Sequence, residues 1–239
     1  MPSTGAMILS VLAFLGALGL VGLSVVAILW GRLRGRPEVT RVSFRILVAT
    51  VGGYALLLFG AGLLSRDRVL APEEEKYFCE LDCHLSYRVT SLRPLPQDPG
   101  GAVWAVSLRT RFDPETISPH RGDAPLTPNP RRVWLITTAG IRVAPVEAPA
   151  AAVDPPGLSS RPLTESLRPG ETYETILFFP AGTGADPASV LVEDDMWPDR
   201  LLIGHEASPF HGRTLLPLPA AGSSVGVSRR EALVAPTRG

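Results

Sequence analysis

Residues 7–30 have the sequence MILSVLAFLGALGLVGLSVVAILW, which contains no charged side chain. As a helix this run would extend for about 36 Å at roughly 1.5 Å per residue, enough to cross the apolar core of a bilayer. A second uncharged run, ILVATVGGYALLLFGAGLL at residues 46–64, is also long enough to cross. Soluble proteins rarely bury helices that are apolar on every face for this length, so we expect a transmembrane helical hairpin within residues 1–65.

The charges beside the two runs predict how the hairpin is oriented. The connection at residues 31–45 contains five arginines and one acidic residue, Glu38, whereas the first six residues are uncharged. Short basic loops stay on the cytoplasmic side, so the N-terminus and everything after residue 64 should lie on the opposite side. A cleaved signal peptide fits poorly, because no basic residue precedes the first run and no small-residue cleavage site follows Trp30.

The composition narrows the possible classes of protein. The 239 residues include 23 basic and 23 acidic side chains, so the net charge of zero removes the electrostatic basis for nucleic-acid binding. Two cysteines are too few for a disulfide-rich scaffold or a four-thiolate zinc site. The chain has one lysine, Lys76, and many arginines, alanines, glycines and prolines, which indicates a bacterium with a GC-rich genome. We therefore expect the bacterial inner membrane, with the N-terminus and C-terminal region in the periplasm.

The rest of the chain is expected to form an all-β domain. Residues 66–76 are a short polar stalk, residues 77–216 hold alternating segments separated by turns, and residues 217–239 form an extended tail. In the segment 102–112, alternation places five residues on the face that we expect to be buried: Trp104, Val106, Leu108, Thr110 and Phe112. The expected strands are 84–92, 102–112, 131–138, 141–146, 171–179, 189–193 and 201–204. About seven short strands with turn residues between them indicate a β-sandwich.

Cys79, Cys83 and His84 form a cluster that could carry chemistry. In an oxidising compartment, an even number of cysteines favours a disulfide between Cys79 and Cys83. Alternatives remain open. The cysteine pair followed by His84 is one residue longer than the usual attachment motif of haem c, and two thiolates with an imidazole could hold copper. His205 and His211 lack the spacing of a helical zinc motif, so we expect ordinary loop histidines there.

The order of these features resembles subunit II of cytochrome c oxidase. That family has a two-helix anchor, an external N-terminus, a periplasmic β-sandwich and two cysteines with three residues between them. In that family a histidine four residues after the second cysteine binds copper, whereas the corresponding residue here is Tyr87. The pair Cys79 and Cys83 also lies at the start of the sandwich instead of near its end. The resemblance therefore implies the topology and not a copper site.

A second resemblance concerns residues 77–205. The segment LRPGETYETILFFP at residues 167–180, together with the strand at 103–112 and the entry at 79–84, is similar to bacterial extracytoplasmic immunoglobulin-like domains of unknown function. This resemblance implies an immunoglobulin-like sandwich and supplies no catalytic residues. No phosphate-binding glycine loop or serine-hydrolase elbow is found in the sequence, so we do not expect an enzyme.

Glycines within the apolar runs suggest what the hairpin does. Small residues let membrane helices approach closely, either within the hairpin or against a partner's helices. The glycines expected at such contacts are Gly16, Gly19, Gly22, Gly53 and Gly60. We therefore expect a non-catalytic accessory or scaffold subunit of a membrane complex without a cofactor of its own. By analogy of size and topology, the complex would be bioenergetic, either a photosynthetic reaction centre with its antenna or a respiratory oxidase. The alternative is a periplasmic redox, copper- or haem-handling protein that uses Cys79, Cys83 and His84.

Overall fold

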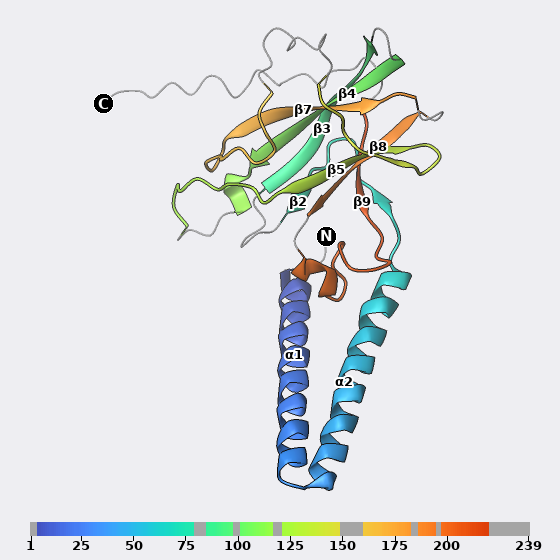
Figure 1. The fold of residues 1–239 in the computed structure, drawn as a ribbon. Helices are drawn as coiled ribbons and strands as arrows, with labels where there is room; N and C mark the ends of the chain where they lie inside the picture. Colours follow the sequence, from blue (N-terminus) through green and yellow to red (C-terminus); the bar gives the residue numbers. More distant parts are fainter. Residues whose placement is uncertain are drawn as a thin grey trace, which may run out of the picture. The chain divides into compact units, whose positions relative to one another are not determined.

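The computed structural model describes residues 4–78, 85–97, 101–116, 121–148, 160–182, 186–194 and 197–219. Two long apolar helices are followed by a β-sandwich of two sheets (Figure 1). The elements are α1 (Thr4–Leu33), α2 (Pro37–Leu64), β1 (Arg68–Val69), β2 (Lys76–Phe78), β3 (Leu85–Gln97), β4 (Gly101–Phe112), η1 (Pro114–Thr116), β5 (Arg131–Thr137), β6 (Arg142–Val143), β7 (Thr172–Pro180), β8 (Pro187–Asp194), η2 (Pro198–Leu201) and β9 (Thr214–Pro217).

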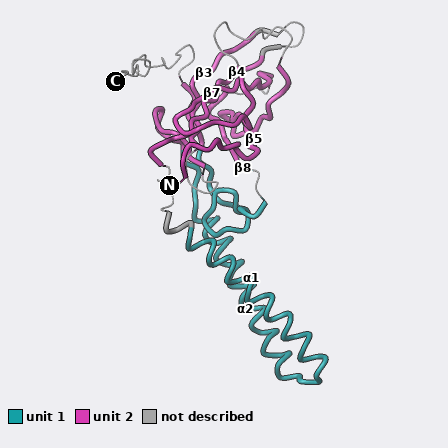
Figure 2. The backbone as a smooth tube through the Cα atoms, turned by 90° about the vertical axis from the view of Figure 1, so that its left-hand side faces the viewer, with its two compact units in different colours: residues 1–68, 194–214 teal, residues 69–193, 215–239 magenta. Residues whose placement is uncertain are grey.

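The chain divides into two compact units (Figure 2). The helical unit contains residues 1–68 and 194–214, and the sandwich unit contains residues 69–193 and 215–239. The assignment of residues 194–214 differs from our expectation, which placed them inside the sandwich domain of residues 77–216. The helical unit is therefore built from two distant parts of the sequence.

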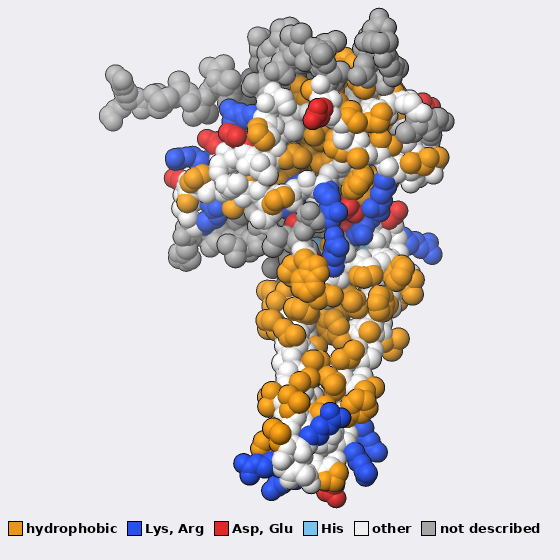
Figure 3. Space-filling model, viewed as in Figure 1, with side chains coloured by type: hydrophobic (Ala, Val, Ile, Leu, Met, Phe, Trp, Pro, Cys, Tyr) orange, Lys and Arg blue, Asp and Glu red, His pale blue; other side chains and the backbone are white. Residues whose placement is uncertain are grey.

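The two helices are long and apolar enough to cross a membrane. Their large apolar side chains are mostly exposed, and Figure 3 shows them covering the helices, with arginines at the connecting turn. The connection is shorter than the expected loop of residues 31–45. It is a tight turn in which Gly35 has a φ of 65° and Pro37 begins α2, so the flanking arginines lie on helical turns.

The sandwich follows the alternation of its sequence. Its sheets have the strand orders β1-β9-β8-β5-β6 and β2-β3-β4-β7. The predicted core face of β4 is confirmed for Val106, Leu108 and Phe112, which are fully buried in one hydrophobic cluster, and Trp104 is partly buried against that cluster. The opposite face was not expected to be buried, but Val103 and Ala105 on it are buried as well. Strands β3 and β4 pair in an antiparallel register that shifts between Val89 and Ser91. The core lies between the sheets, with β5, β8 and β9 contributing from the other layer.

One expected strand is wrong and three strands were not expected. Residues 201–204 do not form a strand: η2 ends at Leu201, and Gly204 turns the chain with a φ of 75°. Pro198 at the start of η2 and Gly204 set turns that a short apolar pattern cannot override. The unexpected strands β1, β2 and β9 are only two to four residues long, which is too short for alternation to be recognised.

Candidate functional site

Residues 197–214, here called the docked segment, pack on the ends of α1 and α2 away from their connecting turn (Figure 1). The Ser10 hydroxyl on α1 donates to the carbonyl of Ile203 at 2.9 Å, and the Tyr54 hydroxyl on α2 donates to the carbonyl of Leu201 at 2.6 Å. Each helix therefore supplies one hydroxyl donor to the same short stretch of backbone. These two bonds fix the docked segment to both helices at once.

Much of the docked segment's backbone is satisfied internally. Five backbone amides each donate to the carbonyl three residues earlier, at 2.9 to 3.3 Å. The donors are the amides of Arg200, Leu202, His205, Ser208 and His211. This pattern is a succession of tight turns that begins with η2. A backbone that closes its own hydrogen bonds can lie where water is scarce.

Close approach to α2 depends on one glycine. A Cβ atom added to Gly62 would overlap the carbonyl oxygen of Pro209 and touch the backbone of Phe210 and His211. One helical turn before Gly62, the ring of Phe59 contacts the ring of Phe210, with the ring centres 6.0 Å apart and an interplanar angle of 54°. Among the described residues other than glycine, Phe210 has a positive φ of 61°. This conformation is uncommon for a residue with a bulky side chain. The chain thus accepts local backbone strain where it meets α2.

His205 organises the middle of the docked segment. Its Nδ1 accepts a hydrogen bond from the amide of Ala207 at 3.1 Å, and its carbonyl accepts one from the hydroxyl of the fully buried Ser208 at 2.6 Å. Burial lowers the pKa of His205 below 6.5, although the nearby carboxylates of Asp199 and Glu206 act in the opposite direction. The neutral imidazole is the form that the Ala207 amide requires, because a protonated Nδ1 cannot accept a hydrogen bond.

Further bonds close the end of the docked segment. Ser65, which follows α2, lies 3.3 Å from Nδ1 of His211, and that nitrogen is also 2.8 Å from the carbonyl oxygen of Gly212. The amide of Arg213 donates to Oδ1 of Asp67 at 2.7 Å. The residues just after α2 therefore hold the last part of the docked segment, and both histidines serve structural hydrogen bonds.

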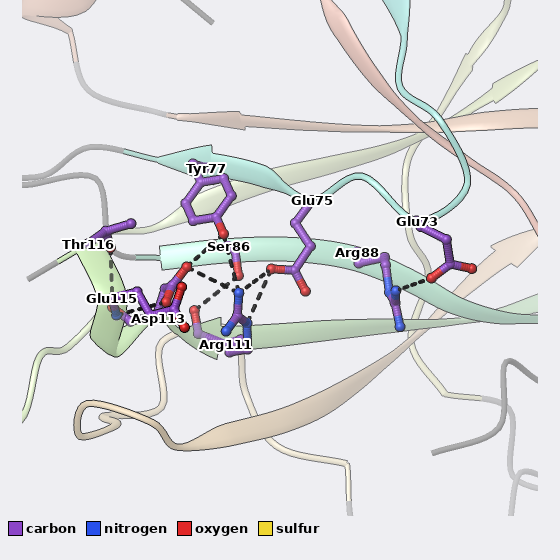
Figure 4. A network of polar contacts seen from close by, with 9 residues as sticks. All are labelled: Glu73, Glu75, Tyr77, Ser86, Arg88, Arg111, Asp113, Glu115 and Thr116. Atoms are coloured by element: carbon purple, nitrogen blue, oxygen red, sulfur yellow. Dashed lines mark hydrogen bonds and ion pairs between the residues drawn. The ribbon is translucent and has the colours of Figure 1, made fainter. Parts of the chain in front are cut away.

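A charged network occupies the four-stranded sheet of the sandwich unit (Figure 4). Arg111 on β4 donates from Nη2 to Glu75 at 2.9 Å, to Asp113 at 3.1 Å and to the Tyr77 hydroxyl at 3.2 Å. The Tyr77 hydroxyl in turn donates to Asp113 at 2.7 Å, and the amide of Glu115 donates to the other oxygen of that carboxylate at 3.0 Å. One guanidinium thus joins two carboxylates and a phenol.

The protonation states of this network favour a structural role. Burial raises the pKa of Tyr77 to about 12, with the hydrogen bond to Asp113 acting in the same direction. Burial alone would raise the pKa of Asp113, but its hydrogen bonds from Tyr77 and the Glu115 amide, together with Arg111, lower it below 3.8. At neutral pH the phenol stays protonated and the carboxylate stays charged. Neither group is therefore poised for proton transfer.

Two cations are buried beside Phe78 within the sandwich, and the sequence pattern did not reveal them. Lys76 donates to the carbonyl of Val192 at 2.8 Å, and its Nζ lies 5.1 Å from the centre of the Phe78 ring. The guanidinium of Arg131 lies 4.4 Å from the same centre. The sequence signal that could have singled out Lys76 is that it is the chain's one lysine, two residues before Phe78. Its cation–π contact with the Phe78 ring helps to offset the loss of hydration on burial.

The residues predicted to carry chemistry have mixed outcomes. Cys79, Cys83 and His84 lie outside the described residues, so the disulfide and the copper or haem alternatives stay predictions. Among the described residues, no three His, Cys, Asp or Glu side chains are grouped to hold a metal ion. The glycines expected at helix contacts meet no neighbour within 4 Å of an added Cβ in the described part of the chain: Gly16, Gly19, Gly22, Gly53 and Gly60. The described glycines where an added Cβ would overlap a neighbouring segment are Gly31, with the Thr40 hydroxyl 2.7 Å from that Cβ, Gly62, and Gly212, whose added Cβ would overlap the backbone of Arg66.

Comparison with known proteins yields no family and no curated relative, because no protein-family model and no curated protein matches the chain. A solved structure of MPT63, a secreted protein from Mycobacterium tuberculosis, matches with a TM-score of 0.40 and 16% sequence identity. The match covers 63% of this chain and 97% of that one. At this level of similarity the function has to be argued from the residues themselves.

Proposed function

We propose that this protein is a non-catalytic accessory or scaffold subunit of a bacterial membrane protein complex. In this proposal α1 and α2 anchor it in the inner membrane, and an immunoglobulin-like sandwich stands in the periplasm. The basic residues at the connection between the helices support an orientation with that connection in the cytoplasm, since short basic loops stay on that side.

The observation that carries the proposal is the exposed glycine stripe of α1. The side of α1 that packs in the hairpin includes Ser10, Phe14 and Ser24, which are partly or fully buried. Gly16, Gly19 and Gly22 are exposed and lie on another side, with open space where a Cβ would be.

This position distinguishes two uses of the glycines. If they served packing within the hairpin, a Cβ at these positions would meet α2. Because it meets no described atom, the stripe is available for a partner's helix, whose backbone could approach closely. The sequence left this choice open, and the geometry favours the partner.

The polar clusters of the described residues support a non-catalytic role. Arg111 is bonded to Glu75 and Asp113, and the docked segment's histidines are engaged with backbone groups or Ser65. Groups arranged in this way stabilise the fold and leave little free chemistry at neutral pH. The choice of a bioenergetic complex, photosynthetic or respiratory, rests on the analogy of size and topology alone.

Purification of the tagged chain from its own membranes in mild detergent tests the proposal. We expect stoichiometric membrane subunits to accompany the wild-type chain, and Gly19→Leu to release them because the added side chain fills the stripe. Leu18→Phe is the matched control, since it adds bulk at an exposed position beside the stripe and should retain the partners. A chain that migrates alone, with or without bound copper or haem, would contradict the scaffold role.

A further inference from the structure

Two large aromatic side chains of the docked segment are exposed although they belong to the helical unit. Trp197 is 67% exposed and Phe210 is 69% exposed. Aromatic side chains at the ends of transmembrane helices commonly lie at the boundary between headgroups and acyl chains. Their exposure therefore raises the question of what surrounds them.

The depth of Phe210 can be estimated from its neighbour on α2. The first charged residue after the span is Arg66, which we take as the level of the headgroups. Phe59 lies five residues before Leu64, where α2 ends, which is about 7.5 Å along the helix. Because the Phe59 and Phe210 rings are 6.0 Å apart, the Phe210 ring lies below the headgroup level, among the acyl chains.

Tyr54 provides a second and independent depth marker. It lies ten residues before Leu64, about 15 Å of helix, and its hydroxyl donates to the Leu201 carbonyl at 2.6 Å. A tyrosine side chain spans less than half of that distance, so Leu201 also lies below the end of the span. The chain around η2 must therefore enter the space between the helix ends.

The hydrogen bonding of the docked segment fits such a position. Backbone groups in hydrocarbon need partners within the protein, because no water is available to bond them. The carbonyls of Leu201 and Ile203 receive hydroxyl donors from Tyr54 and Ser10, and successive amides close turns on earlier carbonyls.

From these observations we propose that the docked segment reaches the outer leaflet: Trp197 lies at the interface and Phe210 lies against acyl chains, while the charged side chains of Asp199, Arg200 and Glu206 stay at the headgroup level. The occupant of the exposed aromatic surface is then lipid. The inference rests on the proposed membrane anchoring of α1 and α2, and it adds a third element to the part of the protein that lies in the bilayer.

Quenching of tryptophan fluorescence by brominated lipids tests this inference on the purified full chain in nanodiscs. The signal of Trp197 is the difference between the wild-type chain and Trp197→Phe, and that of Trp30 is obtained in the same way from Trp30→Phe. We expect lipids brominated near the headgroup end of the acyl chain to quench both residues to a similar extent. In the Trp197→Phe background, Phe210→Trp should be quenched more strongly by bromine placed further down the chain.

The two reporters separate failure of the inference from failure of the anchoring. If Trp30 is quenched by brominated lipid and Trp197 is not, the docked segment lies outside the bilayer and the inference is wrong. Quenching of Trp197 by aqueous iodide but not by lipid would equally place the docked segment in water and overturn the inference. A Trp30 signal that brominated lipid does not quench would instead contradict the anchoring by α1.

Discussion

Replacement of Gly62 by alanine should release the docked segment from α2. The added methyl group would overlap the carbonyl of Pro209, and the backbone there has little freedom to withdraw. Phe210 already adopts a positive φ, and the hydroxyls of Ser10 and Tyr54 hold the same segment from the other end. Overpacking of this kind costs about 1–3 kcal/mol.

The matched control for this change is Gly60→Ala. Gly60 lies on the same helix two residues earlier, and its added Cβ meets no described atom within 4 Å. Both variants gain the same helix propensity, about 1 kcal/mol at most, so their difference isolates the overlap with the docked segment. The size of the change is otherwise identical, one methyl group in each variant.

Hydrogen exchange of the full chain in nanodiscs measures the effect. Opening that is easier by 1–3 kcal/mol corresponds to exchange that is about 5- to 150-fold faster for amides of the docked segment in Gly62→Ala than in Gly60→Ala. Amides of the sandwich unit should not change. Equal exchange of residues 197–212 in the two variants would refute the argument that a glycine at position 62 permits the docking.

Three further outcomes are expected. Arg111→Met should destabilise the sandwich by about 1–3 kcal/mol in denaturant titrations, because two carboxylates lose their cation. Glu73→Gln removes the 76% exposed carboxylate of the single pair with Arg88 and should cost less than about 1 kcal/mol. Burial lowers the pKa of His205, so the neutral imidazole stabilises the docked segment fully at pH values above 6.5, the pKa in the unfolded chain. This stabilisation is lost as the pH falls from 6.5 toward the lower pKa of the folded state. Hydrogen exchange of the docked segment should therefore become faster below pH 6.5, and this pH dependence should be absent in His205→Gln. Thiol labelling with and without reductant should find Cys79 and Cys83 blocked until reductant is added, and two free thiols in the native protein would contradict the disulfide.

The sequence predicts those parts of the fold whose signal is local. About twenty residues or more without charge identify each helix, and alternation identifies the buried face of β4, because each pattern repeats within one element. The helices extend past the apolar runs since arginine is a good helix former and its charge can remain in water. These predictions need no knowledge of which segments meet in space.

The candidate sites depend instead on contacts between distant segments. Ser10 and Ile203 are 193 positions apart, and Tyr54 and Leu201 are 147 apart, so no local pattern indicates that they bond. The alternation of β4 correctly places Arg111 away from the core, but its partner Glu75 lies in what the sequence suggests is a polar stalk. A charged residue in a polar stalk is expected to be solvated, but Glu75 forms an ion pair with Arg111.

The two units satisfy their buried polar groups by different chemistry, and the difference agrees with the environments that we propose for them. In the sandwich unit Arg111 is compensated by full carboxylate charges, which is acceptable where water reaches part of the network. In the helical unit the donors from within the spans are the neutral hydroxyls of Ser10 and Tyr54. A charge at those positions would cost several kcal/mol in hydrocarbon, whereas a hydroxyl can donate one hydrogen bond without that penalty. The carboxylates of Asp67 and Glu206 bond the amides of Arg213 and Thr214 at the end of the docked segment, so only the part held by Ser10 and Tyr54 is suited to contact with hydrocarbon.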